Sequence, residues 1–582
     1  MTYDYIITGA GPAGCVLANR LSADPGIKVL LLEAGGSDRH PYFHMPAGFA
    51  KMTKGIASWG WSTVPQQHLN GRVLWYTQAK VIGGGSSINA QVYTRGNQAD
   101  YDAWATEEGC PGWSYREVLP YFKRAEDNER FAGEFHGYGG PLGVSVPVNP
   151  LPISEAFLRA AQEYGIPYNP DFNGARQEGI GHYQVTVRNA RRSSAAVAYL
   201  KPIRGRSNLT IRTGALATRI VVEAGRAVGV EIIETNGTPT VLLCEREVLV
   251  TSGGIGSPRL LLLSGIGPAD HLRAVGVKVA HDLPGVGTNL QDHLDLYAVA
   301  ECSGDHTYDN YVKLHRTLWA GIQYILFRRG PVASTLFETG GFWYANRSAS
   351  QPDTQFHLGL GSGIEAGVEK LKNPGLTLNS AFLQPRSRGT VRLKSGDPAE
   401  APLIDPNYWS DPYDRRMSLL GLRMAREILQ QPALAPLPAV TGDEIAIAVH
   451  NRGQGWYESA FVQTGVAANV FGMYVPDAAD WQAAGPALDG VGEPEPRTLF
   501  RGTGSGARPS EDRHVLAVVP RHDHLREPRR RRGEDAGAHR ARVDPRPGRE
   551  LEVLCHAAVE EEPAARILRI GEAHCVADSI EA

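Results

Sequence analysis

A glycine-rich turn between two apolar segments near the N-terminus constrains the fold more than any other feature. Apolar residues 3–8 predict a short strand, the GAGPAG turn of residues 9–14 follows at once, and residues 15–22 predict a helix. The apolar run 29–32 predicts a second buried strand, which ends in Glu33. This order of elements is that of a dinucleotide-binding βαβ unit: a strand, a GxGxxG turn, a helix, and a second strand that ends in an acidic residue.

Each part of this unit has a physical role. Gly9 permits the tight turn, Gly11 lets the backbone approach a pyrophosphate, and Gly14 lets the helix pack closely on the strand. Glu33 is placed to accept hydrogen bonds from an adenosine ribose. The helix N-terminus offers N–H groups and the positive end of its dipole to phosphates. A glycine-rich turn without a nucleotide is the alternative, and the flanking elements argue against it. The motif alone does not separate NAD from FAD.

A second glycine-rich segment, GGGSS, begins at Gly83 and is followed by Ile88 and Asn89. Such a run lets the backbone lie flat against a planar or anionic ligand, with N–H groups as donors. A flexible turn is the alternative. The apolar residues 81–82 before the run and Ile88 after it favour a turn that is anchored at both ends.

Three segments resemble the glucose-methanol-choline (GMC) oxidoreductases and stand in the family's order: residues 79–96, 253–267 and 284–293. The one departure in the second segment is Gly254, where the family usually has alanine. The resemblance implies FAD rather than NAD. It also implies an α/β fold, in which a Rossmann-like FAD-binding domain with a parallel sheet is joined to a second domain whose antiparallel sheet covers the flavin.

The resemblance implies that FAD is bound by a set of residues from the two glycine-rich segments and from the ends of the expected strands. These residues are Gly9, Gly11, Pro12, Ala13, Gly14, Glu33, Ala34, Gly83, Gly84, Gly85, Ser86, Asn89 and Ala217. Ala217 enters through the alignment of residues 213–219 with a family segment whose backbone meets the adenine end of FAD. A backbone contact tolerates many side chains.

Residues 40–46, 168–174 and 386–391 narrow the resemblance to a bacterial branch that includes FAD-linked L-sorbose, polyethylene glycol and aliphatic alcohol dehydrogenases. This branch implies oxidation of a primary alcohol, a polyol or a sorbose-like sugar by hydride transfer to the flavin. Electrons would then pass to a quinone or another non-NAD acceptor, such as an artificial dye. The similarity extends from Met1 to about Pro436.

Hydrophobic periodicity predicts a mixed α/β chain between these segments. Helices are expected at residues 153–164 and 414–430, and strands at residues 209–212, 218–223, 227–234, 247–251, 354–358, 376–383 and 389–394. The last three strands are expected in an antiparallel sheet. We therefore predict an FAD-binding domain of residues 1–150 and 205–305, and a substrate-binding domain of residues 151–204 and 306–435.

The pattern breaks after about Pro436. Family members carry a histidine in a His-Pro motif and an Asn or His in an Asn-Thr-Asn motif near the C-terminus, and neither motif is found here. The catalytic residues are therefore unknown. From Arg501 onward the chain has no Phe, Trp or Tyr. We expect residues 436–582 to be an anomalous, partly disordered region. Our hypothesis is that it derives from another reading frame, which translation of the gene in three frames would test.

Charge and composition exclude other classes of protein. The net charge of −3 gives no reason to expect a nucleic-acid partner, and no apolar run is long enough to cross a bilayer. The six cysteines are scattered without a CxxC pair, so no metal site is expected, and no signal-peptide pattern is visible. We expect a cytoplasmic location, with peripheral attachment to the inner membrane left open.

Three alternative functions remain open at this stage. The first is an alcohol oxidase that uses O₂ as its electron acceptor, which would release peroxide during turnover. The second is a flavin-binding protein without activity, because the C-terminal histidine motif is absent. The third is a hydroxynitrile lyase, which would release cyanide without reducing the flavin.

Overall fold

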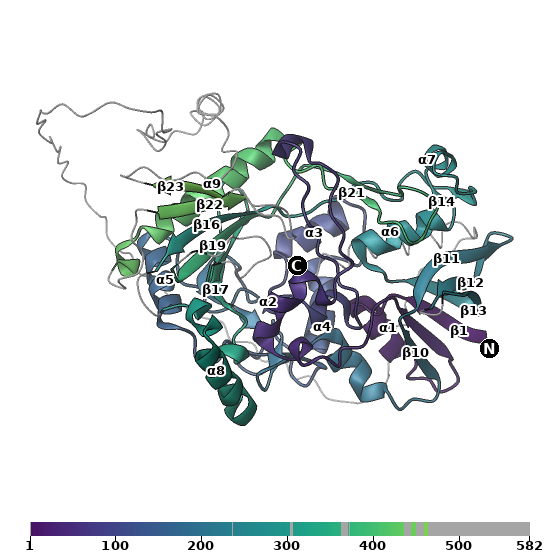
Figure 1. The fold of residues 1–582 in the computed structure, drawn as a ribbon, viewed down its shortest axis with the longest axis horizontal. Coiled ribbons are helices and arrows are strands. Elements are labelled where there is room, and N and C mark those ends of the chain that lie inside the picture. The colour runs from purple at the N-terminus through teal and green to yellow at the C-terminus, as the bar shows by residue number, and fades with distance from the viewer. Residues whose placement is uncertain are drawn as a thin grey trace, which may run out of the picture. The chain divides into compact units, whose positions relative to one another are not determined.

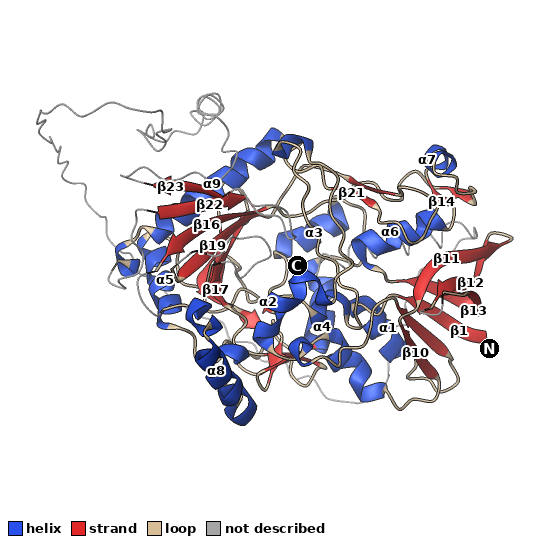
Figure 2. Ribbon diagram, viewed as in Figure 1, coloured by secondary structure: helices blue, strands red, loops and turns tan. Residues whose placement is uncertain are grey.

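The computed structural model describes residues 2–234, 237–302, 306–362, 371 and 373–435, together with the backbone of two further strands, β22 (Glu444–Val449) and β23 (Ser459–Gln463). Within these ranges the strands gather mainly in two sheets, each accompanied by helices (Figures 1 and 2). Most of the predicted anomalous region, including all of its histidines, lies outside the described residues.

The first sheet has six strands and contains the βαβ unit. Their order is β10 (Leu209–Thr213), β2 (Val29–Glu33), β1 (Thr2–Thr8), β13 (Pro239–Val250), β12 (Arg226–Ile233) and β11 (Leu216–Glu223). The first four strands pair in parallel, and the last two add in antiparallel fashion. The glycine turn leads from β1 into α1 (Pro12–Leu21). This is the Rossmann-like parallel sheet that the sequence predicted.

Helices cover both faces of this sheet, because successive strand residues point to opposite sides. Ile6 and Leu30 pack in one core with apolar residues of α6 (Gly253–Leu263). Ile7 and Leu31 pack in another core with residues of α1. Strands that are buried on both faces are continuously apolar, as β2 is. The local sequence therefore contains enough information to place these strands inside.

The second sheet has seven strands, and every neighbouring pair is antiparallel. Their order is β23, β22, β16 (Asp295–Glu301), β19 (Gly375–Phe382), β18 (Thr354–Gly359), β17 (Phe337–Trp343) and β6 (Gly179–His182). Two helices, α5 (Pro152–Glu163) and α9 (Pro412–Leu429), share a core with this sheet, in which Phe157 and Ile428 meet Phe356 and Leu378. The mixed fold class is confirmed.

Among the described residues, five α-helices and five short strand pairs remain. The helices are α2 (Phe49–Lys51), α3 (Gln98–Thr106), α4 (Tyr115–Ala125), α7 (Ala269–Ala274) and α8 (Leu314–Phe327). The paired strands are β3 (Val92–Tyr93) with β7 (Gln184–Val185), β4 (Glu126–Asn128) with β5 (Leu142–Val144), β8 (Val187–Arg188) with β9 (Arg191–Arg192), β14 (Ile266–Gly267) with β15 (His281–Asp282), and β20 (Thr390–Arg392) with β21 (Leu403–Asp405). None of the described helices is both long and apolar enough to cross a membrane.

Three details differ from the sequence-based predictions. β13 begins at Pro239 rather than at residue 247, because its first half, which includes the apolar run of residues 241–244, pairs with β12. β20 pairs with β21 outside the large antiparallel sheet. β16 joins that sheet although it precedes residue 305, so the sheet begins earlier than the predicted domain boundary. The domain division otherwise stays a prediction.

Candidate functional site

The GxGxxG turn is packed so closely that its first and last glycines admit no side chain. Gly9 has φ +106°, and a Cβ at this position would lie 2.4 Å from the carbonyl oxygen of Thr251. A Cβ at Gly14 would lie 2.0 Å from the carbonyl oxygen of Gly9. The turn, the start of α1 and the end of β13 are therefore in direct backbone contact, as the motif predicts.

Gly11, in contrast, faces open space. It is the N-cap of α1, its backbone is extended, and Pro12 follows at the first helical position. A Cβ at Gly11 would meet only the Thr251 carbonyl oxygen, at 4.0 Å. The first N–H groups of a helix have no partners within the helix, so this end of α1 suits an anionic group.

The second glycine-rich segment lies directly on the first. The Gly83 N–H donates a hydrogen bond to the carbonyl oxygen of Ala10 over 2.7 Å. Gly84 has φ +55°, and a Cβ there would lie 2.7 Å from the Cα of Gly11. A Cβ at Gly85 would meet nothing within 4 Å. Two segments more than 70 residues apart thus form one backbone surface, which any side chain at Gly84 would disrupt.

Glu33 fixes the turn from the end of β2. Its carboxylate accepts hydrogen bonds from the Ala10 N–H over 3.0 Å and from the Gly35 N–H over 2.7 Å. Burial raises the pKa of Glu33 to about 7, although these two N–H groups oppose the rise. Ala34 follows and is partly buried. The carboxylate therefore holds the glycine turn in place, and its contact with a ribose stays a prediction.

Ala217 lies two residues beyond the point where its segment contacts this site. The Ala215 N–H donates to the Glu33 carbonyl oxygen over 2.9 Å, and the Gly214 N–H donates to the Gly35 carbonyl oxygen over 2.8 Å. Ala217 itself pairs with Ile232 in the hairpin of β11 and β12. The structure thus brings the predicted adenine-side segment to the end of β2, through its backbone.

Arg192 is a buried cation beside the second glycine-rich segment, and the sequence analysis missed it. Its Nη1 donates to the Asn89 Oδ1 over 2.7 Å and to the Ser86 carbonyl oxygen over 3.2 Å. Its side chain is 1% exposed, and its Nε and Nη2 have no hydrogen-bond partner among the described residues. Burial lowers the pKa of Arg192 to about 9. Only the Arg191-Arg192 doublet in the sequence could have drawn attention to it.

Ser86 completes the support of this segment. Its hydroxyl donates to the Gly83 carbonyl oxygen over 2.6 Å and accepts from the Ala195 N–H over 2.9 Å. The site therefore offers a backbone surface without side chains, a helix N-terminus and a buried cation that no carboxylate of the described residues neutralises. A buried cation is costly without an acceptor, so this set of groups fits a cofactor that carries phosphates.

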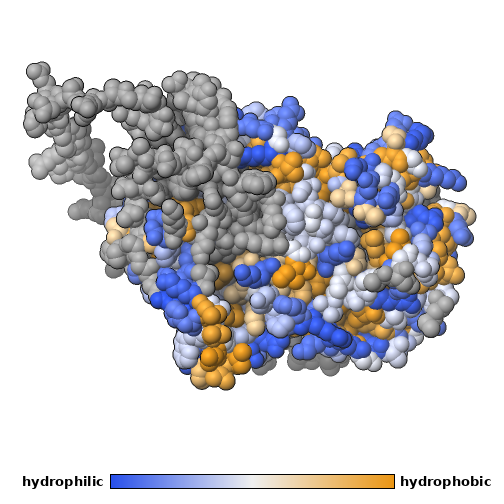
Figure 3. Space-filling model, viewed as in Figure 1, coloured by the Kyte–Doolittle hydropathy of each residue, from blue (hydrophilic) through white to orange (hydrophobic). Residues whose placement is uncertain are grey.

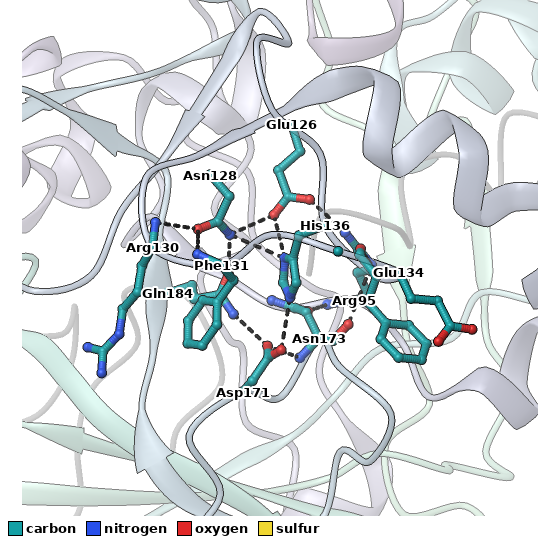
Figure 4. A network of polar contacts seen from close by, with 12 residues as sticks. Arg95, Glu126, Asn128, Arg130, Phe131, Glu134, His136, Asp171, Asn173 and Gln184 are labelled. Carbon is teal, nitrogen blue, oxygen red and sulfur yellow. Dashed lines mark hydrogen bonds and ion pairs between the residues drawn. The ribbon is translucent and has the colours of Figure 1, made fainter.

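A second polar cluster lies on other segments, around His136 (Figure 4). His136 Nδ1 is 3.0 Å from the Glu126 carboxylate, and its Nε2 is 2.8 Å from that of Asp171. Arg95 Nη2 is 2.9 Å from Glu126. Burial alone would lower the pKa of His136, but the two carboxylates raise it to about 9. An imidazolium held between two carboxylates has no lone pair to accept a proton, so this cluster is structural.

A polar cavity of about 330 Å³ lies next to that cluster and is lined by Tyr115 and by residues from three ranges, 95–102, 172–178 and 344–352. It shares no residue with the glycine-rich segments. Among the described residues, no group of three or more His, Cys, Asp or Glu side chains could hold a metal ion.

Comparison with known proteins places these features in a family. Residues 3–295 match one family model described as GMC oxidoreductase, and residues 385–468 match a second with the same description. An alcohol dehydrogenase [acceptor] of Pseudomonas putida is 42% identical over 468 residues, which cover 78% of this chain and 85% of that protein. The mitochondrial choline dehydrogenase of Homo sapiens is 40% identical, with coverage of 75% and 74%.

Solved structures give the same result. Pyridoxine 4-oxidase from Mesorbium loti has a TM-score of 0.67 and 30% identity, with coverage of 76% of this chain and 82% of that one. An FAD-dependent oxidoreductase from Chaetomium thermophilum has a TM-score of 0.69 and 29% identity, with coverage of 75% and 84%. The second family match continues to residue 468, so the predicted end of the similarity near Pro436 was too early.

Proposed function

Because the chain belongs to the GMC oxidoreductase family, we propose that it is an FAD-dependent alcohol dehydrogenase that passes electrons to a non-NAD acceptor. One observation carries the proposal. The two glycine-rich segments meet at Gly84 and Gly11, where they leave a bare backbone surface beside the α1 N-terminus. The similarity to an alcohol dehydrogenase [acceptor] adds the class of reaction, oxidation of a CH–OH group.

The described residues perform the binding part of this function. The α1 N-terminus would receive the pyrophosphate charge of bound FAD, and Glu33 holds the glycine turn that leads into this helix. Arg192 and Ser86 hold the second glycine-rich segment in its conformation and tie it to residues 192–195. Bound FAD supplies the acceptor for the hydride that leaves the alcohol carbon. A general base is also needed for the hydroxyl proton, and we assign this role to no described residue.

A narrower substrate class forms part of the proposal: a primary alcohol, a polyol or a sorbose-like sugar, with a quinone as the acceptor. The resemblance of residues 40–46, 168–174 and 386–391 to sugar and polymer-alcohol dehydrogenases supports it. A cytoplasmic location also stays part of the proposal. Oxidase chemistry is the second candidate, because the chain is similar to a pyridoxine 4-oxidase at 30% identity.

Spectroscopy of the purified full chain tests these functions. We expect a yellow protein whose flavin absorbance bleaches when a primary alcohol, a polyol or sorbose is added without oxygen. Reoxidation by a quinone without peroxide would identify a dehydrogenase, and stoichiometric peroxide in air would identify an oxidase. A protein that stays colourless after incubation with FAD would refute the proposal. A yellow protein that no alcohol bleaches would be the inactive flavin-binding alternative.

Matched glycine variants connect the test to the site. Gly84→Ala would place a methyl group 2.7 Å from the Gly11 Cα, so we expect most of the bound flavin to be lost. Gly205→Ala is the control, because a Cβ at Gly205 meets nothing within 4 Å. Equal flavin content in the two variants would show that the contact between the segments does not form the cofactor site.

A further inference from the structure

Helix α8 carries an unusually exposed apolar surface. Seven of its large apolar side chains are between 45% and 76% exposed: Leu314, Leu318, Trp319, Ile322, Ile325, Leu326 and, at the last position of the helix, Phe327. We call the first six of these residues the α8 apolar face. Figure 3 shows an apolar patch over this helix, at the lower left of the molecule. Contiguous exposed apolar patches mark interaction surfaces, whereas single exposed apolar residues are ordinary.

The opposite side of the helix fixes how this face is presented. Ala320 and Tyr324 are buried, and Tyr324 packs in a small core with Ala190 and Ala333. The Tyr324 hydroxyl also donates to the Ala190 carbonyl oxygen over 3.0 Å. Because one side of α8 is docked in this way, its apolar side faces outward as a fixed feature of the fold.

The charge around the face identifies what it meets. Residues 313–329 contain Lys313, Arg316, Arg328 and Arg329 and no Asp or Glu, although the whole chain has a net charge of −3. Arg328 and Arg329 are exposed, as is Lys313. A helix with Leu, Ile and Trp on one face and cations at its edges is the pattern that lies in the interface of an anionic bilayer.

A second copy of the chain fits this surface less well. A twofold interface would place α8 against the α8 helix of a second copy. If the two helices ran antiparallel, Lys313 and Arg316 of one subunit would lie near Arg328 and Arg329 of the other. Like charges without acids between them oppose such an interface. An anionic lipid surface would bury the α8 apolar face and would also pair the cations with lipid phosphates.

We propose that α8 docks this protein onto the surface of anionic membranes, lying in the plane of the interface. The helix has 14 residues, so it inserts its apolar face without spanning the bilayer. Trp319 anchors the helix at the level of the headgroups, and the flanking cations contact the lipid phosphates. This membrane surface is independent of the proposed catalytic function.

Vesicle sedimentation of the flavin-loaded full chain tests the proposal. We expect binding to vesicles of phosphatidylcholine with 30% phosphatidylglycerol, weaker binding to phosphatidylcholine alone, and release by added salt. The double variant Leu318→Glu/Ile325→Glu should lower the partition coefficient at least about tenfold, because it removes two inserted apolar side chains and adds repulsion. Arg328→Glu/Arg329→Glu should lower it mainly on anionic vesicles.

The control is Val241→Glu/Leu243→Glu, which introduces the same charges at two exposed apolar residues of β13 and should bind as the wild type does. Trp319→Phe should abolish the blue shift of tryptophan fluorescence on vesicle addition. Unchanged flavin absorbance confirms that each variant is folded. The proposal is overturned if the wild type does not bind anionic vesicles, or if the control Val241→Glu/Leu243→Glu weakens binding as much as Leu318→Glu/Ile325→Glu does. It is also overturned if light scattering shows a dimer that Leu318→Glu/Ile325→Glu dissociates.

Discussion

Replacement of His136 by glutamine should remove a specific pH dependence from the stability of this protein. The wild-type imidazolium lies between the carboxylates of Glu126 and Asp171, which raise the pKa of His136 from 6.5 to about 9. At about 1.4 kcal/mol per pKa unit, this rise corresponds to about 3 kcal/mol of folding stability.

The sign follows from the two pKa values. Below pH 6.5 the folded and unfolded chains both hold the proton, so the full stabilisation is present. Between pH 6.5 and about 9 only the folded chain holds it, and stability falls as pH rises. Above about pH 9 the contribution is lost. The melting temperature of the wild type should therefore fall between pH 6.5 and 9.5, by roughly 3 °C from this residue alone.

Calorimetry of the flavin-loaded protein across this pH range, at one scan rate, measures the effect. His136→Gln should melt lower at pH 6.5 and should show a much smaller fall toward pH 9.5. His68→Gln, at an exposed histidine, should follow the wild type. If His136→Gln and the wild type lose stability in parallel, the imidazolium does not stabilise the cluster and the reasoning fails.

Three further predictions concern single contacts. Gly14→Ala should yield protein with little bound flavin, measured as the ratio of visible to ultraviolet absorbance, because the methyl group would lie 2.0 Å from a carbonyl oxygen; full flavin content would contradict the packing argument. Arg192→Met should weaken FAD affinity about tenfold in a flavin-release fluorescence titration, because the Arg192 cation holds the second glycine-rich segment. Arg191→Met, at an exposed arginine, should leave the affinity unchanged, and Arg192→Lys should weaken it less than Arg192→Met does. Glu126→Gln should lower the free energy of unfolding by about 3–5 kcal/mol, because it leaves a buried guanidinium without its carboxylate; Glu155→Gln, at a solvent-exposed pair, should change it by less than about 1 kcal/mol. Equal effects of the two glutamate variants in thermal unfolding would refute this last prediction.

Features that depend on neighbouring residues could be predicted from the sequence. The apolar runs at residues 3–8 and 29–32 became β1 and β2, and the periodic run at 414–430 became α9, since burial pattern and propensity act over a few residues. The conformations of Gly9 and Gly14 followed from the motif for the same reason. In these places local and tertiary preferences agree.

Features created by distant contacts could not be predicted. Arg192 matters because it contacts a segment 103 residues away in the chain, and nothing in its neighbours indicates this. Pairing of β20 with β21 is also decided by tertiary contacts. A histidine that lies among distant carboxylates, such as His136, cannot be distinguished by sequence from one on the surface.

The pairing of β1 with β13 has a consequence for biosynthesis. Thr8 at the end of β1 stands opposite Val250 at the end of β13, so the first strand to leave the ribosome waits for a partner made about 240 residues later. Closing so long a loop is slow, and until then one edge of β1 is unpaired. The nascent chain therefore exposes this apolar edge throughout that interval, where chaperones can bind it, and the cradle for the cofactor is completed only after β13 has emerged.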